Sequence, residues 1–302
     1  MTNSIDDFKE ILLRDEPMSR HTWLKVGGNA EHFFRPRTRD ELLAVARFCS
    51  QQGWPVYLLG GGSNVLVRDQ GIPGAVIQIM EPLLGSVTVD GTTVTAGGGA
   101  LLSHVISEAV RSGLGGLEHL VGIPGTIGGA VAGNSGGRSG DVGQMVRSVT
   151  VLNNAGEVVE LNGDELSFSY RRSSVQDLLV LEVALELVRD DSDELTRRMR
   201  KNWILKRSTQ PLADQSAGCI FRNPRGLSAG ALIEQSGLKG MTVGNARISD
   251  RHANFIVTES GATSRDVEQL IERIRKSVAE KFAVDLETEI KIWPPMPVSD
   301  VG

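Results

Sequence analysis

The feature of this 302-residue sequence that most constrains its fold is the placement of its glycines. Of the 35 glycines, 22 lie between Gly60 and Gly143, in clusters separated by helix-like and strand-like stretches. The clusters follow no fixed period, which argues against collagen, a linker or a repeat protein. In a folded domain, clustered glycine indicates tight turns, or main chain that approaches a ligand too closely for a Cβ atom. We therefore expect a ligand to lie against this region.

The overall composition narrows the class of protein. Apolar residues make up 40% and charged residues 23% of the chain, as in globular proteins, and no apolar run approaches the roughly 18 residues of a membrane helix. The net charge of −5 disfavours a nucleic-acid partner. Two cysteines cannot form a disulfide framework, and the first ten residues lack a signal-peptide pattern. We expect a cytoplasmic protein without membrane partners, either a monomer or a weak homo-oligomer.

The predicted helices and strands interleave irregularly, which indicates an α+β protein. Capping patterns at Thr38 and Thr263 each open an amphipathic helix, the first ending near Gly53 and the second with an apolar stripe to Val278. An acidic stretch after Arg189 marks the expected boundary between residues 1–190 and 191–302. Further helices are expected at 101–111, 194–207 and 229–235, and strands at 56–59, 65–67, 87–96 (a hairpin), 149–153, 158–161, 178–188, 241–243, 254–258 and 286–292.

The first glycine cluster lies between two expected strands. It reads Gly60, Gly61, Gly62, Ser63, Asn64, and it offers consecutive N–H groups together with a hydroxyl and an amide. These groups could form a nest for a phosphate or pyrophosphate. The cluster lacks the Lys-Ser/Thr of a P-loop, and no helix follows it as in a Rossmann turn. From this loop alone, a ligand cradle and a plain turn between strands are about equally favoured.

A second cluster favours the cradle. It reads Gly122, Ile123, Pro124, Gly125, Thr126, Ile127, Gly128, Gly129, Ala130 and is followed by Gly133, Asn134, Ser135, Gly136. Such a run has little side-chain volume to stabilise it, so a flat ligand lying on it is the economical explanation. The alternative is that these glycines allow close packing between backbone elements. Two cradles in one domain indicate a large dinucleotide.

Several blocks, in order along nearly the whole chain, resemble the MurB-type UDP-N-acetylenolpyruvoylglucosamine reductases. They are His21 to Gly28 (HTWLKVGG), Leu59 to Asn64 (LGGGSN), Gly122 to Ala130 (GIPGTIGGA), Ser169 to Ser173 (SYRRS), Ala217 to Pro224 (AGCIFRNP), Gly237 to Gly240 (GLKG) and Leu286 to Ile290 (LETEI). The resemblance implies a two-part FAD-binding region of the vanillyl-alcohol-oxidase (PCMH) type, at about 1–80 and 81–190. It further implies a C-terminal α+β substrate domain at 191–302.

The resemblance also implies the cofactors and their contacts. FAD is expected to bind non-covalently, with NADPH as the hydride donor, and no cluster has metal-ligand spacing. The residues expected at FAD are Gly60, Gly61, Gly62, Ser63, Asn64, Gly122, Ile123, Pro124, Gly125, Thr126, Gly128, Gly129 and Asn134.

The implied reaction is reduction of the enolpyruvyl ether of UDP-N-acetylglucosamine to UDP-N-acetylmuramate, a step of peptidoglycan precursor synthesis. Hydride delivery to the vinyl carbon leaves negative charge next to a carboxylate, so the site needs a cation and a proton donor. Arg171 matches the family's catalytic arginine, whose guanidinium can hold a carboxylate bidentately. Glu289 matches its catalytic carboxylate, and strand alternation would place Glu287 on the same face.

The expected proton donor is Cys219, which stands where the commoner family pattern has serine. A thiol with an ordinary pKa near 8.5 is a better acid than an alcohol and is still mostly protonated at neutral pH. Without the resemblance, Cys219 reads as a small buried residue. The expected substrate-binding residues are Tyr170, Arg207, Asn223 and His252.

Two other functions compete with the reductase. One is an FAD-dependent alcohol or sugar oxidase of the same flavin-binding superfamily; such enzymes often tether flavin through histidine, and neither glycine cluster contains one. The other is a catalytically inactive UDP-sugar sensor, for which the exchange of serine for Cys219 is the only hint. The chain length resembles the shorter class of the family, without the tyrosine-bearing loop, and leaves open what covers the site.

Overall fold

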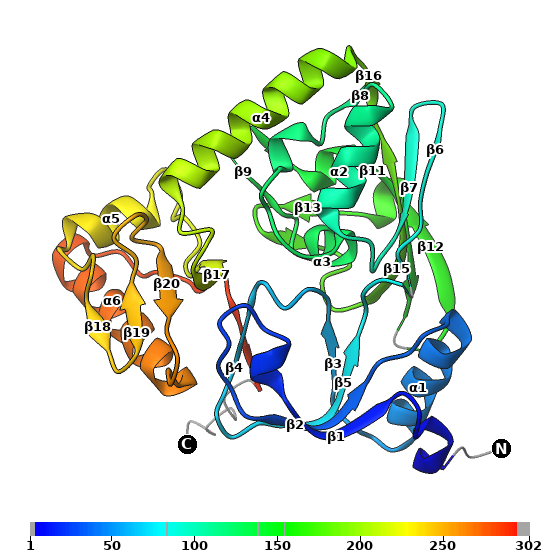
Figure 1. Ribbon diagram of the computed structural model, residues 1–302, viewed down its shortest axis with the longest axis horizontal. Helices are drawn as coiled ribbons and strands as arrows, with labels where there is room; N and C mark the ends of the chain where they lie inside the picture. Colours follow the sequence, from blue (N-terminus) through cyan, green and yellow to red (C-terminus); the bar gives the residue numbers. More distant parts are fainter. Residues whose placement is uncertain (1–3, 83, 138, 154, 295–302) are drawn as a thin grey trace. The chain divides into compact units, whose positions relative to one another are not determined.

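A computed structural model describes residues 4–82, 84–137, 139–153 and 155–294. The chain divides into two compact units, each assembled from separate stretches of the sequence (Figure 1). The first unit comprises Met1–Leu13, Phe34–Gly61 and Val76–Ser208. The second comprises Arg14–Phe33, Gly62–Ala75 and Thr209–Gly302. The domain boundary expected at residue 190 stays a prediction; by contacts within the chain, the first unit continues to Ser208.

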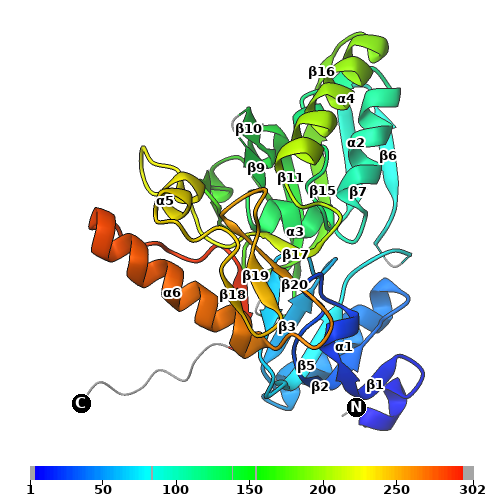
Figure 2. The same ribbon diagram turned by 60° about the vertical axis from the view of Figure 1, so that its left-hand side comes forward.

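The first unit is built on an antiparallel sheet with the strand order β12-β11-β15-β7-β6. Its strands are β6 (Val87–Asp90), β7 (Thr93–Gly97), β11 (Val146–Leu152), β12 (Val158–Asn162) and β15 (Leu179–Glu186). Helices α2 (Leu102–Arg111) and α3 (Ile127–Ala132) pack against each other and against this sheet, as Figures 1 and 2 show. The apolar core between them includes Val105, Ile127 and Val183. The long helix α4 (Ser192–Thr209) buries only Leu195 completely.

A second sheet has the order β1-β2-β5-β3, from β1 (Leu12–Pro17), β2 (Asn29–Phe34), β5 (Ile72–Gln78) and β3 (Val56–Leu59).

The expected helix after Thr38 is α1 (Arg39–Gln51), and the Thr38 hydroxyl accepts the hydrogen bond from the Glu41 N–H. Cys49 lies in the core as expected, and burial raises the pKa of its thiol to about 11. This cysteine is therefore an inert packing residue.

The second unit contains the sheet β17-β20-β19-β18 with helices α5 (Ala229–Gln235) and α6 (Ser264–Phe282). The strands are β17 (Gln215–Cys219), β18 (Thr242–Val243), β19 (Ala246–Ile248) and β20 (Phe255–Thr258). Thr263 forms the predicted capping box with Asp266, and the predicted apolar stripe of α6 is buried. In Figure 1, β21 (Lys291–Trp293) runs beside β4 (Val65–Val67), and the two strands pair in parallel.

The remaining elements are short. The strands are β8 (Leu114–Gly115), β9 (Gly136–Gly137), β10 (Gly140–Asp141), β13 (Phe168–Ser169), β14 (Arg172–Ser173) and β16 (Val188–Arg189), and the 3-10 helices are η1 (Ile5–Phe8), η2 (Met18–Arg20), η3 (Glu118–Leu120), η4 (Val142–Met145) and η5 (Gly163–Glu165). Among the residues that the structure describes, no helix combines the length and apolar character that crossing a membrane requires.

The prediction of a continuous strand at 286–292 was wrong. Only Lys291–Trp293 forms a regular strand, and the preceding residues make a single bridge, between Thr288 and Phe221. Strand alternation therefore does not place Glu287 and Glu289 alike: the Glu287 side chain is 72% exposed and pairs with Arg222 at 3.5 Å, whereas Glu289 is half-buried. The two glutamates have different surroundings because the segment follows an irregular main-chain path.

The capping box at Thr263 generates a stability prediction. Thr263→Ala removes the hydroxyl that accepts the Asp266 N–H, and should lower the free energy of unfolding of the second unit by about 1 kcal/mol. Thr263→Ser, which keeps the hydroxyl, is the matched control and should unfold like the wild type. Urea unfolding followed by circular dichroism measures both; equal midpoints for the alanine variant and the wild type would contradict the prediction.

Candidate active site

The two predicted glycine cradles meet within the first unit. A Cβ on Gly60 would lie 2.7 Å from the Thr126 Oγ1, and one on Gly61 would lie 2.9 Å from the Gly125 Cα. A Cβ at Gly61 would require the opposite main chain to move, and one at Gly60 would require the Thr126 side chain to move. Close packing between backbone elements, the alternative considered for the second cluster, therefore occurs where that cluster meets the first, and it joins two stretches of bare main chain into one surface.

The second glycine cluster is further fixed by a helix that the sequence analysis did not predict. Thr126 caps α3, its hydroxyl accepting the Gly129 N–H at 3.2 Å. The Ile127 and Gly128 N–H groups donate to the carbonyls of Ala100 and Gly98, and a Cβ on Gly128 would lie 2.7 Å from the Gly98 oxygen. The loop is thus held by main-chain contacts rather than by side-chain volume.

These loops fit an anionic dinucleotide such as FAD. Within the described part of the chain, the N–H groups of Gly60 and Gly61 donate to no other residue, so they remain available to a ligand. Ile123, Pro124 and Gly125 are half-exposed beside them. Gly62, Ser63 and Asn64 belong to the second unit, where a Cβ on Gly62 would lie 1.9 Å from the His21 oxygen. The Asn64 side chain donates to the Glu289 carbonyl at 3.4 Å.

Arg171 occupies the tip of a short hairpin in the first unit. Strands β13 and β14 pair through Ser169 and Arg172, which leaves Tyr170 and Arg171 as the turn. Arg171 has a φ of 58°, the left-handed region that non-glycine residues rarely adopt, and its guanidinium lies 5.6 Å from the centre of the Tyr170 ring. Such backbone outliers occur preferentially at functional sites.

A second cation, Lys206 on α4, was not singled out from the sequence. Its ammonium donates to the His119 and Val121 carbonyls, at 3.2 and 2.7 Å, and its chain passes beside Gly122. Burial, together with the positive charge of Arg171, lowers the pKa of Lys206 to about 8. Arg207, which was singled out, is exposed. Trp203, three residues before Lys206 on α4, also lies beside Gly122. Because residues three apart lie on the same face of a helix, this spacing could have indicated Lys206.

Cys219 follows a bulge in the second unit. Gly218 has a φ of 75°, the register of β17 against β20 shifts between Ser216 and Cys219, and Cys219 is half-buried. The next residues are tied down by Asn254, whose amide both accepts the Phe221 N–H and donates to the Phe221 oxygen. The Glu289 N–H donates to the Ile220 carbonyl at 2.7 Å. The residues carrying the expected thiol and carboxylate thus lie on adjacent main-chain segments of one unit.

The remaining expected site residues differ in their surroundings. Tyr170 is 53% exposed at the hairpin tip, and Asn223 accepts the Ala229 N–H at 3.0 Å. Burial lowers the pKa of His252, whose ring contacts Phe255 and accepts the Asn254 N–H. Asn134 is almost completely buried, and its amide bonds to the protein. Within the described ranges, no group of three or more His, Cys, Asp and Glu side chains is arranged to hold a metal ion.

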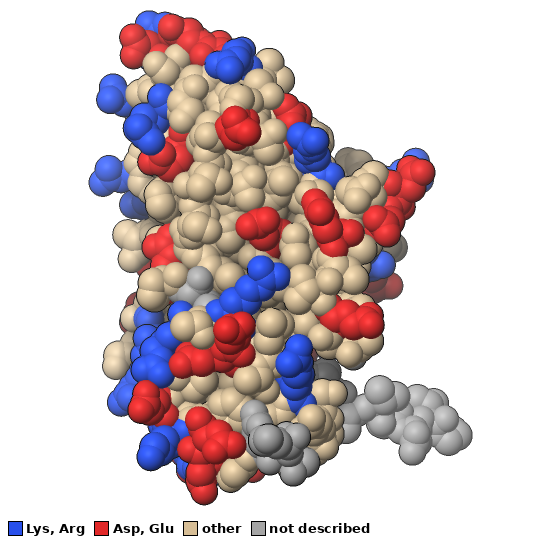
Figure 3. Space-filling view, turned by 90° about the vertical axis from the view of Figure 1, so that its right-hand side faces the viewer, with Lys and Arg blue, Asp and Glu red and all other residues tan. Residues whose placement is uncertain are grey.

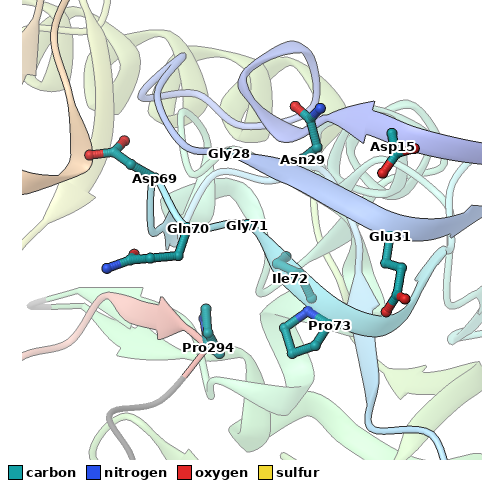
Figure 4. Close-up of a pocket in the computed structure, with 10 residues that line it drawn as sticks. All are labelled: Asp15, Gly28, Asn29, Glu31, Asp69, Gln70, Gly71, Ile72, Pro73 and Pro294. Atoms are coloured by element: carbon teal, nitrogen blue, oxygen red, sulfur yellow. The ribbon is translucent and has the colours of Figure 1, made fainter.

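A hollow of about 770 Å³ in the second unit contains none of the expected site residues (Figure 4). Three carboxylates, Asp15, Glu31 and Asp69, line it together with Gly28, Asn29, Gln70, Gly71, Ile72, Pro73 and Pro294. Glu31 accepts the Gly74 N–H, and Asp69 accepts the N–H groups of Ser264 and Arg265. At least two of these acids therefore hold main chain in place, and we assign the hollow no ligand.

Comparison with known proteins identifies the family. Residues 30–162 match the model of an FAD binding domain, and residues 210–293 match that of the UDP-N-acetylenolpyruvoylglucosamine reductase C-terminal domain. The chain is 42% identical over 282 residues to UDP-N-acetylenolpyruvoylglucosamine reductase 2 of Symbiobacterium thermophilum, covering 93% of this chain and 91% of that one. The chain belongs to the UDP-N-acetylenolpyruvoylglucosamine reductase family.

Two further members of this reductase family are similar to the chain over most of its length. The Moorella thermoacetica reductase is 43% identical over 283 residues, 93% of each chain. The crystal structure of the Thermus caldophilus reductase superposes with a TM-score of 0.79 at 38% identity, covering 92% of this chain and 97% of that one. The fold expected from the sequence is confirmed: an α+β reductase with an FAD-binding domain of the PCMH type and the family's C-terminal domain.

The contact between the glycine loops of the reductase generates a second prediction. Gly61→Ala places a methyl group against the Gly125 main chain and should weaken FAD binding about 10- to 100-fold by forcing the loops apart. Gly137→Ala is the control, because a Cβ there meets no atom within 4 Å. Titration of apo-protein with FAD, followed by flavin fluorescence, measures both affinities; an unchanged affinity of the Gly61 variant would refute the role of this contact.

Proposed function

We propose that this protein reduces the enolpyruvyl ether of UDP-N-acetylglucosamine to UDP-N-acetylmuramate with NADPH as the hydride donor. The observation that carries the proposal is full-length similarity to named reductases, across both the FAD-binding and the C-terminal domain. We further propose that it belongs to the shorter class of the family, without the tyrosine-bearing loop.

The first task of the chain is to hold the cofactor. Bound FAD supplies hydride transfer between NADPH and the vinyl carbon. The residues that we propose to hold it are Gly60, Gly61, Gly62, Ser63 and Asn64 together with the main chain of Gly122–Gly129. Unbonded N–H groups in a glycine loop bind phosphate oxygens well, because no side chain blocks their approach.

The second task is to stabilise the negative charge that develops beside the substrate carboxylate. Arg171 would do so, since a guanidinium pairs with a carboxylate bidentately and keeps its charge when partly buried. Lys206 adds a second positive charge close enough to Arg171 for its pKa to be affected. The pair makes this part of the first unit favourable for an anion.

The third task is to deliver a proton to the substrate carbon. We assign this to the Cys219 thiol, which is placed by the bulge at Gly218. We propose Glu289 as the catalytic carboxyl group near the developing enolate. A half-buried carboxyl group works best here in its protonated form, because an ionised one would repel the developing enolate. Tyr170, Arg207, Asn223 and His252 are proposed to contact the UDP-sugar.

We infer a cytoplasmic location, because the proposed reaction uses NADPH and a UDP-sugar, which are cytoplasmic metabolites. On the face drawn in Figure 3, basic and acidic side chains are interspersed. A monomer or weak homo-oligomer without nucleic acid stays our expectation.

The proposed activity is tested by steady-state kinetics. Purified protein should consume NADPH only when UDP-N-acetylglucosamine enolpyruvate is present, with equimolar formation of UDP-N-acetylmuramate detected by mass spectrometry. NADPH consumption that requires only oxygen, or no consumption at all, would refute the proposal.

The role of Cys219 gives a third prediction. Cys219→Ala should leave reduction of the flavin by NADPH at the wild-type rate and slow its reoxidation by the enolpyruvyl substrate by about 100-fold or more, because only the second step needs the proton. Cys219→Ser keeps a proton donor and should retain partial activity. Stopped-flow absorbance under anaerobic conditions separates the two steps; wild-type reoxidation in the alanine variant would remove Cys219 from the mechanism.

A further inference from the structure

The hairpin that carries Arg171 is too short to fix its own position. Strands β13 and β14 contribute two residues each, and the turn includes Arg171 in a left-handed conformation. An isolated two-stranded hairpin is marginally stable even when it is longer, and a left-handed non-glycine residue adds strain. The surrounding structure must therefore hold this hairpin in place.

Two side-chain bonds attach the hairpin to the C-terminal end of α3. The Asn134 Nδ2 donates to the Ser169 carbonyl at 2.8 Å, and the Ser173 hydroxyl donates to the Ala132 carbonyl at 2.8 Å. Each strand of the hairpin is thus bonded once to the segment that follows the glycine cluster. The Ser169 carbonyl lies one residue before the turn, so the bond from Asn134 acts close to Arg171.

Asn134 is itself held in place through both its main chain and its side chain. Its φ of 43° and the bonds from its N–H to the Val131 carbonyl and from the Ser135 N–H to the Ala130 carbonyl form a Schellman motif at the end of α3. Its Oδ1 accepts the Gly143 N–H at 3.0 Å. Gly143 in turn leaves room for Phe168 of the hairpin, because a Cβ there would lie 2.5 Å from the Phe168 Cγ.

We propose that Asn134 is a positioning residue for Arg171, and that it acts on the substrate half of the reaction rather than as a contact of FAD. Asn134 is 2% exposed, and both the oxygen and the nitrogen of its side-chain amide form hydrogen bonds to the protein. This replaces our expectation that Asn134 binds the cofactor. The inference rests on the proposed function, in which the Arg171 guanidinium stabilises the developing charge.

Two variants of Asn134 test the inference. Asn134→Gly keeps the left-handed backbone that glycine favours at this position and removes both side-chain bonds. Asn134→Asp keeps the acceptor for the Gly143 N–H and replaces the donor to the Ser169 carbonyl by an oxygen. Asn245→Asp is the matched control, because it removes a bond of similar kind, from Nδ2 to the Ser260 carbonyl at 2.9 Å, in an exposed turn.

Both Asn134 variants should bind FAD with wild-type affinity and reduce it with NADPH at the wild-type rate. Reoxidation by the enolpyruvyl substrate should be slowed about 10- to 100-fold, the usual effect of misplacing a catalytic group by about 1 Å. The Asn245 variant should match the wild type in all three measurements. A changed FAD affinity or visible spectrum in both Asn134 variants, or wild-type reoxidation in both, would overturn the inference.

A double-mutant cycle distinguishes positioning of Arg171 from a general loss of structure. If Asn134 acts through Arg171, then Asn134→Gly should slow reoxidation no further in an Arg171→Ala background. Additive losses would overturn the inference and leave the role of Arg171 intact. Wild-type reoxidation in Arg171→Ala alone would instead refute the role proposed for Arg171, so the two failures give different results.

Discussion

The structure of the first unit depends on how closely two glycine loops approach each other. Gly60 and Gly61 leave no room for a Cβ atom against Thr126 and Gly125, and Gly128 leaves none against Gly98. These contacts are between main-chain segments and capping groups, so they do not depend on large side chains. They explain how a run with so little side-chain volume is ordered, and they bring N–H groups with no partner in the described protein to one surface. The glycine content thus serves packing, and we propose that it serves cofactor binding as well.

The residues assigned to the chemistry are positioned by local devices of a different kind. Arg171 is itself the left-handed residue of a turn, and Cys219 directly follows a bulge at Gly218. Each irregular segment is bonded to a buried asparagine, Asn134 or Asn254, that satisfies main-chain groups through its amide. A side-chain amide can replace a missing ladder partner because it carries both a donor and an acceptor. Polar side chains therefore fix these segments where regular secondary structure ends.

Much of the fold follows from local sequence signals. The capping patterns at Thr38 and Thr263, the hairpin at 87–96 and the apolar strand that became β15 were predictable, because each depends on neighbouring residues. Strands β1, β2 and β5 were not predictable in this way, because their pairing is set by distant segments. Helix α3 was not predictable either, because glycine has a low helix propensity and only the Thr126 cap and buried Ile127 indicate a helix there.

The candidate site was predictable in its residue types but not in their contacts. The glycine clusters indicated bare main chain near a ligand, yet nothing in the sequence said that the two clusters touch. Lys206 and Arg207 are adjacent in the sequence, and only the helix position shows which one turns toward Gly122. Alternation failed at Glu287 because the segment is not a regular strand. The resemblance implied Asn134 at the cofactor, and only the structure shows that its amide bonds to Ser169 and Gly143.

We propose that these bare loops hold a flavin that passes electrons from NADPH to an enolpyruvyl sugar. The most direct measurement is the visible spectrum of the purified protein in the absence of oxygen. We expect flavin absorbance that bleaches when NADPH is added and returns, mole for mole, when UDP-N-acetylglucosamine enolpyruvate is added next. A colourless protein that takes up no FAD, or a bleached flavin that recovers only when oxygen is admitted, would contradict it.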